Sequence, residues 1–284
     1  MIALPWVAIF LAAPTTYFPA VRRLSLGLLA LGYAAALANG QLGLPAAIPL
    51  ALLVLAAHAV QPDRKPHVRR IGHLLFIALA VGLSLHWLPG FHNPRVIGPA
   101  QFGPGAVPFT MHLNLDKPLI GFWLLLVLPW VRPRYGLRTS LLAGTGAWLV
   151  TTATCLAAAT ALGIVAWAPK WPAASWLWLL NNLLLVTFAE EALFRGYLQG
   201  GMSRLLKSQP CGEVLAIGAA AALFGLAHIA GGWQWVALAS IAGVGYGLAY
   251  RFGGLQAAVL AHFGLNATHF FLFTYPMLQR AGGQ

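Results

Sequence analysis

Residues 181–196 read Asn-Asn-Leu-Leu-Leu-Val-Thr-Phe-Ala-Glu-Glu-Ala-Leu-Phe-Arg-Gly. They lie inside a largely apolar run, 174–200, which as a helix is long enough to cross the hydrocarbon core of a bilayer. Two adjacent carboxylates, Glu190 and Glu191, and one guanidinium, Arg195, stand within this run. Ionisable side chains are costly inside a membrane and usually mark a functional site. This segment is therefore the first candidate for chemistry.

The composition of the whole chain indicates a membrane protein. Of its 284 residues, 60% are hydrophobic and 8% are charged, whereas about a quarter of the residues of an average soluble protein are charged. The formal net charge is +12, which in a soluble protein would suggest a nucleic-acid partner. In this chain the basic residues stand in short loops between apolar runs, the arrangement that orients membrane proteins. We therefore predict an integral membrane protein that contacts the lipid bilayer and no nucleic acid.

The apolar runs predict the fold class. Because one helical span needs about 20 largely apolar residues, the chain has roughly ten candidate spans. We expect an all-α fold, a polytopic bundle of membrane helices. The longest polar connection, 90–117, is rich in proline and glycine and is expected to be an irregular outer loop. The candidate spans lie near 2–19, 24–39, 43–60, 71–89, 118–131, 140–166, 174–200, 213–230, 232–250 and 254–275.

Basic residues are distributed unevenly between alternate loops. By the positive-inside rule the richer side faces the cytoplasm, which places both termini outside the cytoplasm. The heavy use of Ala, Leu, Trp and Arg is typical of a GC-rich bacterial genome, so the expected location is a bacterial inner (cytoplasmic) membrane. The richer side contains Arg22, Arg23, Arg64, Lys65, Arg69, Arg70, Arg132, Arg134, Arg138, Arg204, Lys207 and Arg251, and the opposite side contains Arg95, Lys117, Lys170 and Arg280.

Helical geometry separates the two adjacent carboxylates. Glu191 and Arg195 are four residues apart and share a face of the helix, with the acid before the base in the favoured order. Arg195 is therefore expected to neutralise Glu191. Glu190 lies about 140° away from Arg195 around a helix of 3.6 residues per turn. A carboxylate in such a position suits a general base or acid, and the other interpretation is an ion-pair network that holds helices together.

Two further apolar helices carry polar side chains at regular spacing. The eighth span contains Phe224-Gly-Leu-Ala-His228, and the tenth contains His262-Phe-Gly-Leu-Asn266, so each pair shares one helical face. Neutral imidazole and carboxamide groups can both donate hydrogen bonds to a developing oxyanion. The alternatives are a satisfied core histidine in the eighth span and an interhelical hydrogen-bonding pair in the tenth.

The three segments together resemble one known family. The patterns EExxxR, FxxxH and HxxxN, each on a separate apolar helix and in this order, are similar to the motif set of the CAAX-protease-type (CPBP) family. That family includes the type II CAAX prenyl proteases and many bacterial relatives. The resemblance divides the chain into an N-terminal transmembrane region, 1–137, in which we recognise no motif, and a CAAX-protease-like catalytic membrane domain, 138–276.

The resemblance implies that the protein is a peptidase that acts inside the membrane. The implied partner is a membrane-associated protein or peptide, such as one with a C-terminal anchor, a sorting tail or a CAAX-like segment. Carried over position by position, Glu190 would activate the attacking water, and His228 would hold and orient that water. His262 and Asn266 would stabilise the tetrahedral oxyanion. These four residues are the predicted catalytic set.

The same resemblance leaves two kinds of peptidase open. Glu190, His228 and His262 form a His₂Glu set, which is a known ligand set for catalytic zinc, so a metallo-type enzyme is one alternative. A glutamate-dependent enzyme that requires no cofactor is the favoured expectation. In either case the implied supporting residues are Glu191 and Arg195, which would fix the helix of Glu190, and Phe224, which would pack beside His228.

Two other functions use the same residues differently. A proton-coupled membrane transporter would use the intramembrane Glu, His and Arg side chains as a proton relay, although the chain has no recognisable inverted repeat. A non-proteolytic membrane scaffold of the same family would keep the fold without turnover, although all three motifs are intact.

Overall fold

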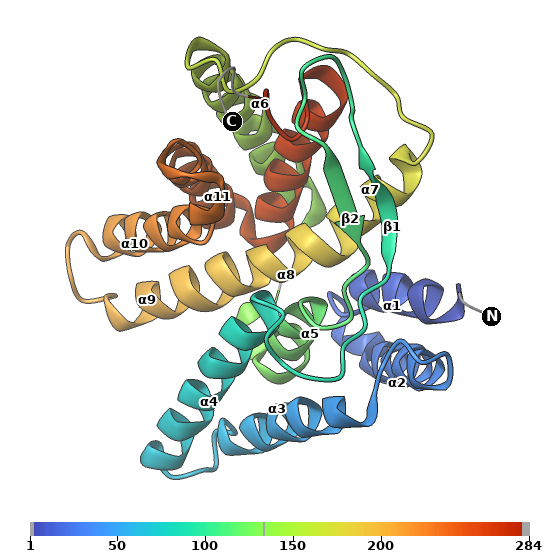
Figure 1. Ribbon diagram of the computed structural model, residues 1–284. Helices are drawn as coiled ribbons and strands as arrows, with labels where there is room; N and C mark the ends of the chain where they lie inside the picture. The colour runs from blue at the N-terminus through green and yellow to red at the C-terminus, as the bar shows by residue number, and fades with distance from the viewer. Residues whose placement is uncertain (1–2, 133, 280–284) are drawn as a thin grey trace. The chain divides into compact units, whose positions relative to one another are not determined.

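The computed structural model describes residues 3–132 and 134–279. Arg280 and the first residue of the expected span 2–19 lie outside these residues. Nearly all of the regular structure is helical (Figure 1), which confirms the all-α class. The helices are α1 (Leu4–Thr15), α2 (Arg22–Ala38), α3 (Ala47–Ala59), α4 (Pro66–Ser84), α5 (Pro118–Val127), α6 (Leu137–Ala161), α7 (Ser175–Asn181), α8 (Phe188–Glu191), α9 (Gly200–Leu205), α10 (Gly212–Leu226) and α11 (Trp233–Leu272).

Within the described residues, four helices are long and apolar enough to cross a membrane: Pro19–Ala38, Pro66–Ser84, Leu137–Ala161 and Ser175–Leu205. Four more apolar helices are shorter, namely Leu4–Thr15, Leu44–Ala59, Pro118–Val127 and Gly212–Leu226. The expected count of about ten spans is therefore not confirmed. Large apolar side chains are exposed on the long helices, for example Leu142 and Val150 on α6. Such exposure is unfavourable in water and ordinary in lipid, as expected of an integral membrane protein.

The chain divides into two compact units. The first contains Met1–Pro94, His112–Pro129 and Leu184–Ala189. In it α1 packs against α2, and α3, α4 and α5 pack together. Trp123 of α5 stacks on Phe76 of α4 with ring centroids 3.9 Å apart, and its indole N–H donates a hydrogen bond to the carbonyl of Leu53. The stacked rings and the hydrogen bond of the indole thus join α3, α4 and α5 in a common core.

The second unit contains Arg95–Met111, Trp130–Leu183 and Glu190–Gln284. Its centre is α11, which packs against α6 and α10 (Figure 1). Gly254 interrupts α11 with φ 75° and ψ −169°, a conformation that glycine adopts without steric cost. The break separates two helical segments, as expected from the candidate spans 232–250 and 254–275. Small residues line the contacts, which lets the helices approach closely, as is common in membrane bundles.

A short hairpin and an aromatic cluster complete the second unit. Strands β1 (Arg95–Ala100) and β2 (Phe109–His112) pair within the segment that we expected to be irregular. Ile97 and Met111 of this hairpin pack on Trp178 and Phe270, whose rings are stacked at 4.1 Å. Sequence periodicity did not reveal these strands because glycine and proline interrupt the segment.

The close contact of α6 with α11 allows a prediction about the free energy of unfolding. A Cβ atom at Gly144 would lie 2.9–3.1 Å from Leu260 and from the backbone of Ala257, whereas a Cβ atom at Gly146 would meet nothing within 4 Å. We expect Gly144→Ala to lower the free energy of unfolding by about 1–3 kcal/mol because it overpacks the contact. Gly146→Ala should be neutral or stabilising by up to about 1 kcal/mol through helix propensity. Thermal unfolding of both variants in one detergent tests this, and equal melting temperatures would contradict it.

Candidate active site

The helix that carries the two carboxylates is not a uniform α-helix. Glu190 and Glu191 lie in the short α8 segment, with π-helical turns on both sides, Asn182–Thr187 and Ala192–Gln199. π-Helical turns are rare and often occur at functional sites. Their wider turns change which side chains share a face of the helix. A uniform period of 3.6 residues therefore does not give the contacts of the two carboxylates.

Glu191 binds two partners through one oxygen. Its Oε1 accepts a hydrogen bond from Arg195 Nη1 at 2.9 Å and another from His262 Nδ1 at 2.7 Å. The side chains of Glu191 and Arg195 are fully buried. The ion pair expected from the i,i+4 spacing is therefore present. The contact with His262, which is 71 positions away, is an addition that the sequence did not indicate.

Besides its ion pair with Glu191, the buried side chain of Arg195 has polar and aromatic contacts. Its Nη2 donates to the carbonyl of Gly243 at 3.1 Å. Its guanidinium lies over the rings of Phe224, at 4.5 Å, and Tyr246, at 5.1 Å. Aromatic faces attract a cation when water is excluded. Arg195 thus connects the Glu191 helix to α10 and α11, which agrees with a supporting role.

His262 lies between the two carboxylates. Because an ionised carboxylate only accepts hydrogen bonds, the ring donates from Nδ1 to Glu191. Its other nitrogen, Nε2, lies 3.9 Å from Glu190 Oε2. Tyr246 stacks on the imidazole at 4.5 Å, and Phe224 meets it edge-on at 5.5 Å. The ring orientation is therefore fixed by packing and by Glu191, with Nε2 on the side of Glu190.

His228 is not inside a helical span, which corrects the expectation for 213–230. Helix α10 ends at Leu226, and His228 lies in the following turn. Its ring nevertheless folds back, because Nδ1 donates to the carbonyl of Phe224 at 2.8 Å, and the two rings lie 4.7 Å apart. A carbonyl cannot donate, so Nδ1 carries the proton. In the neutral ring Nε2 is then a hydrogen-bond acceptor.

Asn266 is held by a residue that sequence reasoning did not select. Its Nδ2 donates to Asn182 Oδ1 at 3.3 Å, and Asn182 is itself buried. The only sequence signal for Asn182 is an Asn-Asn pair in an apolar run. Tyr246 was also missed, since a tyrosine in an apolar helix is ordinary. One amide proton of Asn266 remains for a hydrogen bond to a bound group.

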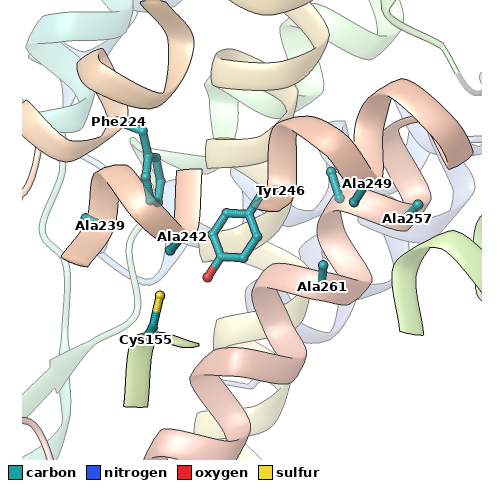
Figure 2. Close-up of a cluster of buried hydrophobic side chains, with 9 residues drawn as sticks. Cys155, Phe224, Ala239, Ala242, Tyr246, Ala249, Ala257 and Ala261 are labelled. Atoms are coloured by element: carbon teal, nitrogen blue, oxygen red, sulfur yellow. The ribbon is translucent and has the colours of Figure 1, made fainter. Parts of the chain in front are cut away.

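His228, His262 and Asn266 line one cavity of about 80 Å³ in the second unit, enough for several water molecules. In Figure 2 the ring of Tyr246 points toward Cys155, and both residues line this cavity together with Phe224 and Ala242. The rest of the lining is mainly apolar, with His269 as a further polar member. Three of the four predicted catalytic residues thus meet at one cavity, and Glu190 joins them through its contact with His262.

The same geometry bears on the zinc alternative. Among the residues that the structure describes, no three His, Cys, Asp or Glu side chains are placed to hold a metal ion. Glu190, His228 and His262 therefore do not form a three-ligand set as arranged. Nδ1 of each histidine is engaged, with Phe224 and with Glu191.

Comparison with known proteins adds one finding. Residues 172–268 match the family model of the type II CAAX prenyl endopeptidase Rce1-like proteins. This segment contains all the residues that the motifs selected, from Glu190 to Asn266. A search of curated proteins and a search of solved structures gave no match. Over this segment, about a third of its length, the chain is similar to the type II CAAX prenyl endopeptidases.

Proposed function

We propose that the protein is an intramembrane endopeptidase in which Glu190 is the general base that activates water. The observation that carries this proposal is the contact of Glu190 with His262, whose other ring nitrogen is held by Glu191. The pair stands beside a cavity that can hold water. A carboxylate next to an oriented imidazole is an arrangement suited to moving protons.

The proposed role of His262 requires both of its ring nitrogens to donate hydrogen bonds, which only the imidazolium form can do. We propose that His262 takes part in the reaction in this form. The imidazolium then donates from Nδ1 to Glu191 and from Nε2 toward the reacting group, while Glu190 stays ionised and can accept a proton.

The proposed reaction follows from these positions. Glu190 takes a proton from water as the water oxygen bonds to the substrate carbonyl carbon. The carbonyl oxygen becomes an oxyanion and accepts hydrogen bonds from His262 Nε2 and Asn266 Nδ2. His228 Nε2 accepts the other hydrogen of the water and so orients it. Glu190 then passes its proton to the leaving nitrogen, the C–N bond breaks, and a carboxylic acid and an amine are released.

The proposed substrate is associated with the membrane. We propose a membrane-associated protein or peptide that presents a C-terminal anchor, a sorting tail or a CAAX-like segment, and the matched family description supports the last of these.

We also propose that residues 138–276 form the catalytic domain and that 1–137 is a separate membrane region. The proposed location is a bacterial inner membrane, with both termini outside the cytoplasm. Reporter fusions at the two ends test the orientation.

The cleavage experiment separates this function from transport and from scaffolding. Membrane peptides are compared by mass spectrometry between cells with the wild-type protein and cells with Glu190→Gln or His262→Ala. A substrate should accumulate in both variants at unchanged expression, and the purified wild-type protein should cleave it. Equal processing by wild-type and variant proteins would exclude a protease.

Metal analysis of the same preparation tests the proposal that cleavage requires no metal. Stoichiometric zinc together with chelator-sensitive cleavage would overturn that proposal.

Asn182 allows a prediction about positioning. Asn182→Ala removes the acceptor that holds Asn266, so we expect kcat to fall by roughly tenfold, less than the 10²–10³-fold loss expected for Asn266→Ala. KM should change little because neither group is proposed to bind the substrate before reaction. Asn181→Ala is the matched control, since it removes the same group one position away. If Asn181→Ala and Asn182→Ala reduce kcat equally, the positioning role is wrong.

A further inference from the structure

A second cavity in the second unit shares no lining residue with the candidate active site. Its volume is about 270 Å³. Five of its twelve lining residues are basic, and Glu213 is its only carboxylate among the described residues. Glu213 lies 3.6 Å from one of the cations, Arg251. The basic residues are Arg132, Arg134, Arg204, Lys207 and Arg251.

Two of these cations are held close together. Arg204 Nη2 and Arg134 Nη2 both donate to the carbonyl of Trp130, each at 3.0 Å. Arg204 also donates to Gly200 at 3.1 Å and stacks on the Trp130 ring at 3.9 Å. Like charges at a shared acceptor repel each other unless an anion or water compensates them. The arrangement thus fixes positive charge at one point of the cavity wall.

Uncharged donors line the same cavity. The hydroxyl of Ser203 is buried and has no hydrogen-bond partner among the described residues. Gly254 and Leu255 also contribute to the lining, and they begin the second segment of α11 after the break at Gly254. The first N–H groups of a helix have no carbonyl partner within it and favour an anion. An unpartnered hydroxyl and a helix N-terminus therefore add to the basic side chains.

We infer that this cavity binds a phosphate-bearing anion. A phosphate group offers several acceptor oxygens and negative charge, which matches guanidinium groups, a hydroxyl and helical N–H groups. The expected topology places all five basic residues on the cytoplasmic side, where anionic phospholipid headgroups are concentrated, and basic pockets between membrane helices on that side bind such headgroups. The two sources of the group are a lipid headgroup and free phosphate.

The test uses the full-length protein purified in a neutral detergent. Binding is measured with short-chain phosphatidylglycerol, with phosphatidylcholine of the same chain length, and with inorganic phosphate. We expect saturable binding of phosphatidylglycerol that the double variant Arg134→Gln/Lys207→Gln weakens by roughly tenfold or more. The control, Arg69→Gln/Arg70→Gln, removes the same charge from exposed positions of α4 and should change affinity less than about twofold. Glu213→Gln should tighten binding, because it removes the carboxylate from the wall.

Each outcome decides the inference. Binding of phosphatidylglycerol without binding of inorganic phosphate supports the site with a lipid headgroup as its source. Binding of inorganic phosphate with the same variant pattern supports the site with a soluble anion. Equal loss of affinity in the two double variants would overturn it, because the interaction would then be general surface electrostatics. An unchanged or weaker affinity of Glu213→Gln would also overturn it, and this variant keeps every basic residue and therefore tests the site even if the double variant unfolds.

Discussion

Replacing Glu190 with glutamine is expected to lower kcat for peptide cleavage by roughly 10²–10⁴-fold, the usual contribution of a general base. Glutamine has nearly the same shape and can still lie against His262, but it cannot accept a proton from water. KM should stay nearly constant, because the proposed role begins only when water attacks. The measurement is the steady-state rate of purified wild-type and variant proteins on the peptide identified by its accumulation.

The control for this substitution is Asp63→Asn, which neutralises a carboxylate at an exposed position of the first unit. It should leave kcat and melting temperature unchanged. Glu190→Gln should also keep the wild-type melting temperature to within a few degrees, since it preserves the size of the side chain and leaves the buried Glu191–Arg195 ion pair intact. A Glu190→Gln enzyme that retains more than about a tenth of the wild-type kcat would show that another group activates the water.

Removing the carboxylate of Glu191 is expected to cause the largest loss of stability. Glu191→Gln leaves the fully buried guanidinium of Arg195 without its ion-pair partner, and breaking one side of a buried pair costs about 3–5 kcal/mol. Thermal unfolding in detergent should show a markedly lower melting temperature. Glu213→Gln is the matched control, because the Glu213–Arg251 contact is partly exposed at 3.6 Å and should be worth less than about 1 kcal/mol.

A double substitution separates stability from positioning. Glu191→Leu with Arg195→Met replaces the buried pair by apolar side chains, an exchange that is often neutral for stability. We expect the melting temperature to recover while cleavage stays lost, because His262 no longer has an acceptor for Nδ1. Recovery of both properties would show that Glu191 only balances the charge of Arg195.

The sequence by itself determined much of the secondary structure. Candidate spans such as 140–166 and 213–230 coincide broadly with helices α6 and α10. This is because a long run of apolar residues predicts a helix that lies in lipid. It also determined the Glu191–Arg195 pair, since residues four apart on one helix meet wherever that helix lies. These features depend on local spacing alone.

The tertiary structure alone decided how the site is assembled. The contact of Glu191 with His262, the support of Asn266 by Asn182, and the return of His228 toward Phe224 all depend on how helices cross and where they end. A 3.6-residue period could not give them, because π-helical turns beside Glu190 change the register and α10 ends before His228. The basic cavity likewise combines helices and connecting segments that are distant in sequence. Spacing predicts neighbours along one helix, whereas packing between helices selects which polar groups share a site.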